Sequence, residues 1–524
     1  MCGFFASVWS YLLLLLIVLL LRWDKICYFV VEGMRLLAWS VWIMTCWTMK
    51  LPHSAGLNAL EERRSEVKLV CKSTALANYI TQHCEALTHP PQASWPRTDP
   101  HLQILFNLIW PTDDDGGIYF TRDNLLLQDG GIVGLDWAVG LKDLKAQTKK
   151  EHPPGGKALG CHTINPPIII LIPNALGKIT HHLLSLCRLA LQQGFYPVVF
   201  HRRGHAGCPL ATPRYQQFGD PSDLVQAVAY LQNRHPSSVL LAISEGSGSG
   251  LLLSYLGECG SSSYLVAAAC ISPVFHGQVW FETALPRLYH EAALLYNKLQ
   301  LSRYATALGS VMDVEKILHC RSLQDMEKLM FCAVSLQDNS EMDIMDHAGE
   351  PRSASSMKPD WVDYWECNEP LRDADEVAVP VLCVCSSDDP LVLSSSTLPV
   401  SLFQNNPYFL LALTSLGSHC GFMQKKARGT SCWSHEAVLE YFRVVGDFFK
   451  VEEKERLMEG SVGKCAVQEL KQRTSTALPR RRKAVMVRRG RPVWGPQRQL
   501  LAHLGRVPFE DEQNTFTWNR SYTR

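Results

Sequence analysis

Short apolar runs alternate with amphipathic stretches through the middle of the chain. A continuous apolar run bounded by turn residues favours a strand buried on both faces, and the longer stretches repeat apolar positions at helical spacing. Strands and helices that alternate at this spacing indicate parallel βαβ units joined by right-handed crossovers. The predicted strands are 168–172, 196–200, 239–243, 265–271, 379–385 and 408–413, and the predicted helices are 179–191, 220–233 and 436–451.

Residues 274–360 interrupt this alternation with helical stretches and polar loops. An insertion at that place in an α/β fold lies over the strand ends, where it can shield an apolar substrate. We therefore predict a lid or cap. The alternative is a structural excursion without a gating role.

The N-terminus is the most apolar part of the chain. Residues 3–21 approach the length that spans a bilayer, and Arg22 and Lys25 follow them. A signal peptide would favour a basic start and a small-residue cleavage site, so an endomembrane anchor is preferred to secretion after signal cleavage. The stretch 36–49 carries three tryptophans and is typical of an interfacial helix, although it could instead pack on the globular domain.

The composition is that of an ordinary globular protein and excludes few functions. The chain has 524 residues, 47% apolar, and a net charge of +1, so no global field points to nucleic acid. The 18 cysteines are scattered without zinc-site spacing, which favours free thiols and implies neither metal nor cofactor. The predicted parts are an anchor and interfacial helix (1–50), a helical extension (51–110), an α/β domain (111–452) and a basic, disordered tail (453–524).

Two dense basic clusters, 480–483 and 488–491, mark the tail. Such clusters can dock on anionic lipid or on an acidic partner. A solvated tail without a single partner is the alternative.

A candidate nucleophile follows the run 239–243. A strand that turns at once into a helix, with Ser at the apex and Gly two residues later, is typical of a nucleophile elbow. Ser244 would be that apex, because Ala242 and Gly246 supply the small residues that the tight turn needs. The N–H groups of the following helix would then face an oxyanion. An ordinary Gly/Ser loop is the alternative.

A carboxylate and a histidine follow at later strand ends. Asp389 comes after the strand 379–385, and His419 stands between two glycines after the strand 408–413. The order Ser, Asp, His along the chain is that of the α/β-hydrolase triad, in which His takes the proton of Ser and the acid orients His. Asp388 stays open as the acid. Separately, Asp389 could be a turn residue and His419 an exposed loop residue.

The motifs that carry a family resemblance are 201–214, 244–250, 388–390 and 417–422. They resemble those of the membrane-anchored α/β-hydrolase domain-containing proteins of the YheT-like branch. The resemblance implies an α/β-hydrolase fold and esterase, acylglycerol lipase or phospholipase chemistry, with the triad on Ser244, Asp389 and His419. The oxyanion hole would use the N–H groups of Glu245 and of the loop that holds Asn174 and Ala175.

The chain departs from that family in three places. Ala242 stands where Gly is usual, and Glu245 replaces the apolar residue expected after the nucleophile. An ionised Glu245 would oppose an oxyanion. In addition, Asn174 follows Pro173 where Gly is expected.

Two functions therefore compete. The first is a membrane-associated serine hydrolase that cleaves a lipid or other acyl ester in lipid metabolism. The second is a catalytically weak or inactive protein of the same fold that regulates lipid metabolism through protein partners, using the lid and the basic tail.

Overall fold

A nine-stranded sheet organises the molecule, in the order β1-β9-β8-β7-β6-β4-β5-β3-β2. The computed structural model describes residues 23–52, 67–109, 118–140, 166–332, 359–424 and 432–470, apart from gaps at 92, 94–95, 97–98, 284 and 393–396. Strands β4 to β9 run parallel, whereas β1, β2 and β3 are antiparallel to their neighbours. The strands are β1 Lys68–Val70, β2 Ile118–Leu126, β3 Ile132–Gly140, β4 Ile168–Ile172, β5 Tyr196–His201, β6 Leu240–Glu245, β7 Leu265–Ile271, β8 Val381–Ser386 and β9 Phe409–Thr414.

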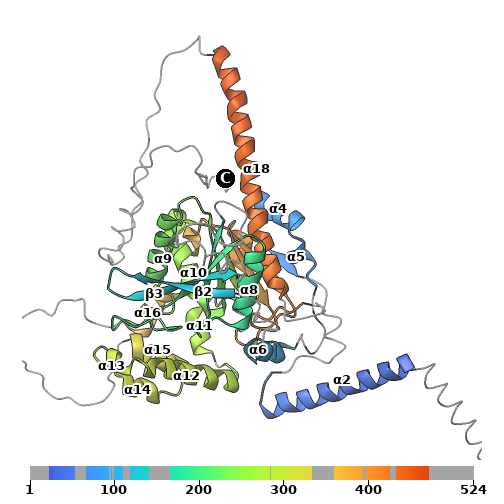
Figure 1. Cartoon of the computed structure of the whole chain (residues 1–524), viewed down its shortest axis with the longest axis vertical. Coiled ribbons are helices and arrows are strands. Elements are labelled where there is room, and N and C mark those ends of the chain that lie inside the picture. The colour runs from blue at the N-terminus through green and yellow to red at the C-terminus, as the bar shows by residue number, and fades with distance from the viewer. Residues whose placement is uncertain are drawn as a thin grey trace, which may run out of the picture.

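Helices cover both faces of this sheet (Figure 1). Alternate residues of β4 separate into two apolar cores, with Ile169 and Leu171 in one and Ile168, Ile170 and Ile172 in the other. The first core also receives α4 Ala75–His83, α5 Glu85–Thr88, α8 His181–Gln192 and the start of α18 Trp433–Leu470. The second receives α9 Ser222–Arg234, α10 Ser249–Cys259 and α17 Val400–Asn405.

The insertion after β7 forms a helical layer with an apolar core of its own, centred on residues such as Leu301, Ile317 and Trp365. It gathers at one end of the molecule (Figure 1). We call this layer the lid below, although its role as a lid stays a prediction and residues 333–358 of the predicted insertion lie outside the described residues. Its helices are α11 Gly277–Glu282, α12 Arg287–Ser302, α13 Ala305–Leu308, α14 Val314–His319, α15 Leu323–Phe331 and α16 Trp361–Asn368.

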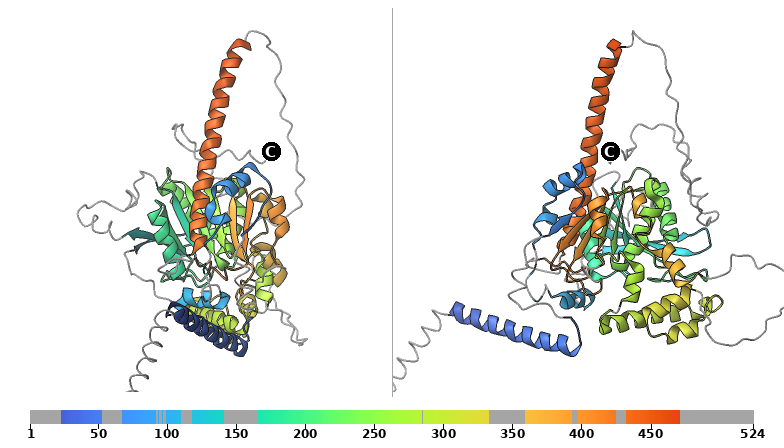
Figure 2. Two further views of the ribbon diagram at one scale, coloured as in Figure 1. Left: turned by 90° about the vertical axis from the view of Figure 1, so that its right-hand side faces the viewer. Right: turned by 180° about the vertical axis from the view of Figure 1, so that it is seen from behind.

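The two ends of the described chain are helical. Helix α2, Trp23–Thr48, lies at the lid end with α6 Pro100–Ile109, and α18 projects from the opposite end (Figure 2). The predicted anchor, residues 3–21, lies outside the described residues. Among the helices that are described, none is both long and apolar enough to cross a membrane.

The structure differs from the sequence predictions at the two edges of the sheet. Strands β2 and β3 were not predicted, and β1 interrupts a stretch that had helical character. At the C-terminus, α18 continues to Leu470, beyond the predicted start of the tail at residue 453. The basic clusters of the tail lie outside the described residues, so their role stays a prediction.

Candidate active site

The turn that follows β6 has its apex at Gly246, two residues later than predicted. Ser244 and Glu245 are still strand residues, paired in register with Cys270 and Ile271 of β7. Gly246 has φ +50° and begins a short 3-10 turn, Gly246–Gly248, that leads into α10. A positive φ at the residue between strand and helix is the strained geometry of a nucleophile elbow. The prediction that Ser244 is the apex is therefore wrong.

Gly246 is also the residue that faces the candidate base. A methyl carbon added at Gly246 would lie 2.7 Å from Nε2 of His419 and 3.6 Å from Cβ of Asn174. Ser244, in contrast, is fully buried, and its hydroxyl has no hydrogen-bond partner among the described residues. The structure therefore does not bring Ser244 together with His419, and the position that a nucleophile would occupy carries no side chain.

Close packing explains why the turn starts where it does. A Cβ at Gly248 would come within 2.5 Å of the carbonyl oxygen of Pro173 at the end of β4, so this position must be glycine. The small residues two before and two after the apex are thus Ser244 and Gly248, rather than Ala242 and Gly246. Ser244 is one of the small flanking residues of the elbow, not its nucleophile.

The other two predicted residues do meet. Nδ1 of His419 lies 2.9 Å from Oδ2 of Asp389. The second oxygen of Asp389 accepts the N–H groups of Leu391 and Val392 at 2.8 and 3.1 Å, which fixes the carboxylate. The acid beside His419 is therefore Asp389.

Asp388 binds backbone N–H groups and not the imidazole of His419. Its Oδ1 accepts the N–H groups of Gly417 and Ser418 at 3.0 and 2.8 Å, so it shapes the loop that holds His419. Burial raises the pKa of the Asp388 carboxyl to about 6, although these hydrogen bonds oppose the shift.

The charge of Asp389 governs the titration of His419. Burial alone would lower the pKa of this imidazole, but the negative charge and the hydrogen bond of Asp389 outweigh burial, and the net pKa lies above the ordinary value. A base held in this way would be suited to accept a proton from a neighbouring hydroxyl.

One N–H group of the predicted oxyanion hole already has a hydrogen-bond partner within the protein. The N–H of Ala175 donates to Oγ of Ser247 at 2.8 Å, and Oδ1 of Asn174 accepts the N–H of Leu176 at 3.0 Å. With Gly246 at the apex, the residue after it is Ser247, so the amide of Ser247 takes the place predicted for that of Glu245.

Glu245 faces the core that α8 and α18 cover. Its Oε1 lies 2.5 Å from Nδ1 of His182, and Nε2 of His182 lies 2.9 Å from Nε2 of His435. All three side chains are buried. The carboxylate that we expected to oppose an oxyanion therefore has a direct partner in His182.

Sequence reasoning missed this histidine pair. The available signal was Glu245 itself, because a carboxylate beside a buried strand requires a partner. Among the described residues, one group of three side chains has the arrangement to hold a metal ion, and it consists of His182, Cys432 and His435.

The motif 201–214 builds structure around this site rather than the site itself. Arg203 donates to both oxygens of Asp223 on α9, each at 2.6 Å, and to Asp129 at 2.6 Å. His201 lies 2.9 Å from Oδ2 of Asp136 on β3. These contacts tie the loop after β5 to its neighbours.

The mostly parallel sheet with helices on both faces, the tight turn after β6 and the His–Asp pair at later strand ends define an α/β-hydrolase-fold protein. No family model matches the chain. The human protein named "Protein ABHD15" is 46% identical to it over 390 residues, which cover 74% of this chain and 75% of that protein. The chain therefore belongs to the ABHD15 family of α/β-hydrolase-fold proteins.

More distant relatives carry names of lipid-ester hydrolases. Mouse "Phospholipase ABHD3" is 24% identical over 367 residues, covering 68% of this chain and 79% of that protein. "Monoacylglycerol lipase" of Saccharomyces cerevisiae (strain ATCC 204508 / S288c) is 20% identical over 378 residues, covering 66% of this chain and 79% of that protein. The chain is thus related to phospholipases and lipases.

Proposed function

We propose that this protein is a catalytically silent member of the α/β-hydrolase fold that acts by binding rather than by ester hydrolysis. The observation that carries the proposal is the bare backbone of Gly246 beside Nε2 of His419. Serine hydrolysis begins when a hydroxyl gives its proton to His and attacks the carbonyl carbon. Gly246 has no hydroxyl to supply, and Ser244 is fixed two residues earlier in the strand, on the order of 6 Å away.

The binding surface in this proposal is the lid end. Trp280 of α11 donates to the carbonyl oxygen of Leu391 at 3.0 Å, which holds the lid against the loop that carries Asp389. The apolar space there, lined by Val279, Trp280 and Val392 among others, has a cavity volume of about 20 Å³. That volume is roughly that of one water, so an acyl chain or a partner would have to displace α11.

The serine hydrolase is the second candidate. The His419–Asp389 pair favours it, because the geometry of an acid-oriented base is present. Relatives named as phospholipase and monoacylglycerol lipase favour it as well. The two candidates differ in one measurable property, which is the presence of an activated serine.

Labelling by a fluorophosphonate probe tests the proposal. We expect the folded wild-type chain to remain unlabelled and Gly246→Ser to become labelled, because the new hydroxyl would stand beside Nε2 of His419. The added Cβ would lie only 2.7 Å from Nε2, so the imidazole must move aside to accept it, and the φ of +50° at Gly246 adds backbone strain to any substitution at this position.

Two matched variants make this test specific. Gly246→Ala adds the same Cβ without a hydroxyl and should stay unlabelled, and Ser244→Ala in the Gly246→Ser background should keep the label. Labelling of the wild type that disappears in Ser244→Ala would overturn the proposal in favour of the hydrolase.

We also propose that the protein is held at a membrane by residues 3–21 and that α2 lies at the membrane surface. Large apolar side chains of α2 are exposed, with Trp47 at 74%. Five of them recur at helical spacing and form one stripe, as in a helix that lies in the headgroup region: Val31, Met34, Leu37, Val41 and Met44.

Contacts hold α2 at the lid end of the domain. Nε1 of Trp42 donates to Oδ2 of Asp99 at 2.9 Å, just before α6. Figures 1 and 2 show α2 at the same end of the molecule as the lid helices. A membrane under α2 would therefore lie next to the surface that we propose for binding.

Vesicle flotation separates the two membrane contributions. A chain without residues 1–22 should still bind anionic vesicles, though more weakly than the full chain, and Leu37→Glu with Val41→Glu should abolish that remaining binding. Ser40→Glu, at an exposed polar position beside the stripe, is the control for the single substitution Leu37→Glu and should have a smaller effect. Equal binding by all variants would refute a surface role for α2.

A further inference from the structure

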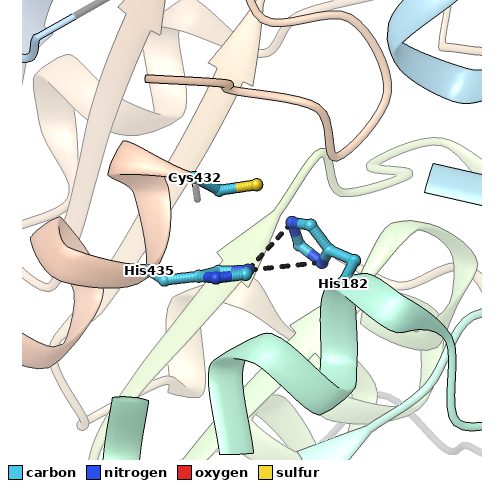
Figure 3. A group of neighbouring side chains, drawn as sticks. All are labelled: His182, Cys432 and His435. Carbon is cyan, nitrogen blue, oxygen red and sulfur yellow. Dashed lines mark hydrogen bonds between the residues drawn. The ribbon is translucent and has the colours of Figure 1, made fainter. Parts of the chain in front are cut away.

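A buried group of three metal-ligating side chains lies behind the turn that holds Gly246. His182 is in the first turn of α8, Cys432 directly precedes α18, and His435 is in the first turn of α18. The available ligand atoms of the three residues all lie within 4.8 Å of one another. In Figure 3 the sulfur of Cys432 and the ring of His435 both point toward the imidazole of His182.

The three side chains of this cluster are buried, unlike the polar groups of a protein surface. His182, Cys432 and His435 have exposed fractions of 5%, 3% and 1%. Three polar side chains that converge in a buried core require either a complete set of hydrogen bonds or a cation. Two imidazoles and one thiol form a ligand set suited to a borderline-soft ion such as Zn²⁺.

The distances are close to those of a tetrahedral site. Nε2 of His435 lies 2.9 Å from Nε2 of His182. Two nitrogens bound to one tetrahedral zinc at about 2.0–2.1 Å lie about 3.3 Å apart. Nε2 of His435 also lies 3.3 Å from Nδ1 of His182, so the His182 ring must turn, as well as move by a few tenths of an ångström, before its Nε2 lone pair points at the ion.

Glu245 contacts one of the three candidate ligands, His182, without being a ligand itself. Its carboxylate binds Nδ1 of His182, which leaves Nε2 of that ring to face His435 and Cys432. A carboxylate behind a ligating imidazole is the usual way in which proteins fix the orientation of a zinc-bound histidine.

We propose that Nε2 of His182, Nε2 of His435 and Sγ of Cys432 bind one Zn²⁺, with Glu245 positioning His182 and a water as the fourth ligand. The charges balance, because the thiolate and the Glu245 carboxylate together offset the two positive charges of the ion. Zinc binding releases the thiol proton of Cys432 to solvent and involves no redox change.

The site would be structural and independent of any hydrolytic activity. It would connect three elements that are distant in sequence, namely the end of β6 through Glu245, the start of α8 and the start of α18. Because Glu245 directly precedes Gly246, the ion would hold the turn after β6 in place from behind.

Metal analysis of the full chain tests the proposal. The protein is purified without chelators and without a polyhistidine tag, and zinc is counted by inductively coupled plasma mass spectrometry. We expect about one zinc per wild-type chain and a loss of roughly tenfold or more in Cys432→Ser and in His435→Gln. Cys187→Ser is the matched control, because Cys187 is an equally buried cysteine on α8 that is not among the three ligands.

Two further measurements, the absorption spectrum of bound Co²⁺ and the unfolding temperature, distinguish the loss of a metal ligand from misfolding. Co²⁺ added to the metal-free wild type should give visible bands of tetrahedral cobalt and a thiolate charge-transfer band. The thiolate band should be missing in a Cys432→Ser chain that still unfolds cooperatively. A chelator should lower the unfolding temperature of the wild type and of Cys187→Ser, but not that of Cys432→Ser.

Three results would overturn the zinc assignment. These are a wild-type chain without stoichiometric metal after equilibration with Zn²⁺, stoichiometric copper in place of zinc, and an unchanged zinc content in the folded Cys432→Ser and His435→Gln variants. The first would indicate that Glu245, His182 and His435 form only a buried chain of hydrogen bonds.

Discussion

The backbone N–H of Ala175 donates a hydrogen bond to Oγ of Ser247 over 2.8 Å. This N–H belongs to the loop after β4 that supplies one half of an oxyanion hole in α/β hydrolases. A hydroxyl of the protein itself therefore accepts the N–H that an oxyanion would need. In the proposal of a catalytically silent protein, the bare backbone of Gly246 and this internal hydrogen bond are two independent obstacles to hydrolysis.

Removing that hydroxyl should increase any activity that Gly246→Ser creates. One oxyanion-hole donor typically changes turnover by about 10²–10³-fold. We expect Gly246→Ser with Ser247→Ala to react with a fluorophosphonate at least ~10-fold faster than Gly246→Ser alone. Ser249→Ala in the same background deletes a nearby hydroxyl that bonds Val274 instead and should give no increase. Equal rates in both double variants would show that Ser247 does not restrict the hole.

The titration of His419 should depend on Asp389. Asp389→Asn removes the charge that raises the pKa of His419 and leaves the burial that lowers it, so the pKa should fall. NMR of ring-labelled histidine measures this shift. Asp388→Asn is the control, because Asp388 bonds backbone N–H groups of the loop and not the imidazole. An unchanged His419 titration in Asp389→Asn would contradict the pairing.

The same pair makes a pH-dependent contribution to stability. The pKa of His419 is raised in the folded chain, so its stabilisation is complete below the unfolded value of 6.5 and is lost as pH rises through the folded pKa. The advantage of the wild type over Asp389→Asn in unfolding temperature should therefore be larger at pH 5.5 than at pH 9. A difference that grows toward pH 9 would contradict this sign.

The lid contains a second pH-dependent group. Burial raises the pKa of Glu327 to about 7, against the opposing hydrogen bond from the Tyr364 hydroxyl at 2.5 Å and the charge of Arg202. Its stabilisation is present below the unfolded value of 4.5 and is lost as pH rises through about 7, by about 3 kcal/mol in total.

Glu327→Gln should remove most of this dependence. The decrease in unfolding temperature between pH 5 and pH 8 should be smaller in Glu327→Gln than in the wild type. Glu315→Gln, at an exposed glutamate on α14, is the control and should behave like the wild type. A decrease of equal size in all three proteins would show that Glu327 is not the responsible group.

The buried ion pair in the motif 201–214 should carry a large stability effect. The side chains of Arg203 and Asp223 are 2% and 1% exposed, so Arg203→Met leaves a buried carboxylate without its partner. Loss of one member of such a pair costs about 3–5 kcal/mol in the free energy of unfolding. Arg214→Met removes a half-exposed arginine that pairs with Asp220 and should cost about 1 kcal/mol or less. Urea denaturation measures both, and similar costs would refute a structural role for Arg203.

Much of the fold was readable from local patterns. The predicted strands 168–172 and 265–271 have the bounds of β4 and β7, because each is a continuous apolar run between turn residues. Strand β2 was missed because it has no fully buried position: half-buried residues alternate with exposed ones, which include Tyr119 and Leu126, and the strand sits at the sheet edge. Strand β3 was missed as well, and its pairing with β2 appears only in the tertiary structure.

For the candidate site, the sequence by itself determined the α/β order and the strand ends where Asp389 and His419 follow, because both depend on local periodicity. Where β6 ends was decided only by tertiary structure. The pairing of Ser244 and Glu245 with β7 and the contact of Glu245 with His182 extend the strand by two residues. By its polarity, the dipeptide Ser244-Glu245 favours the start of a turn. Partners distant in the chain keep it in the sheet instead, and this leaves Gly246 at the apex.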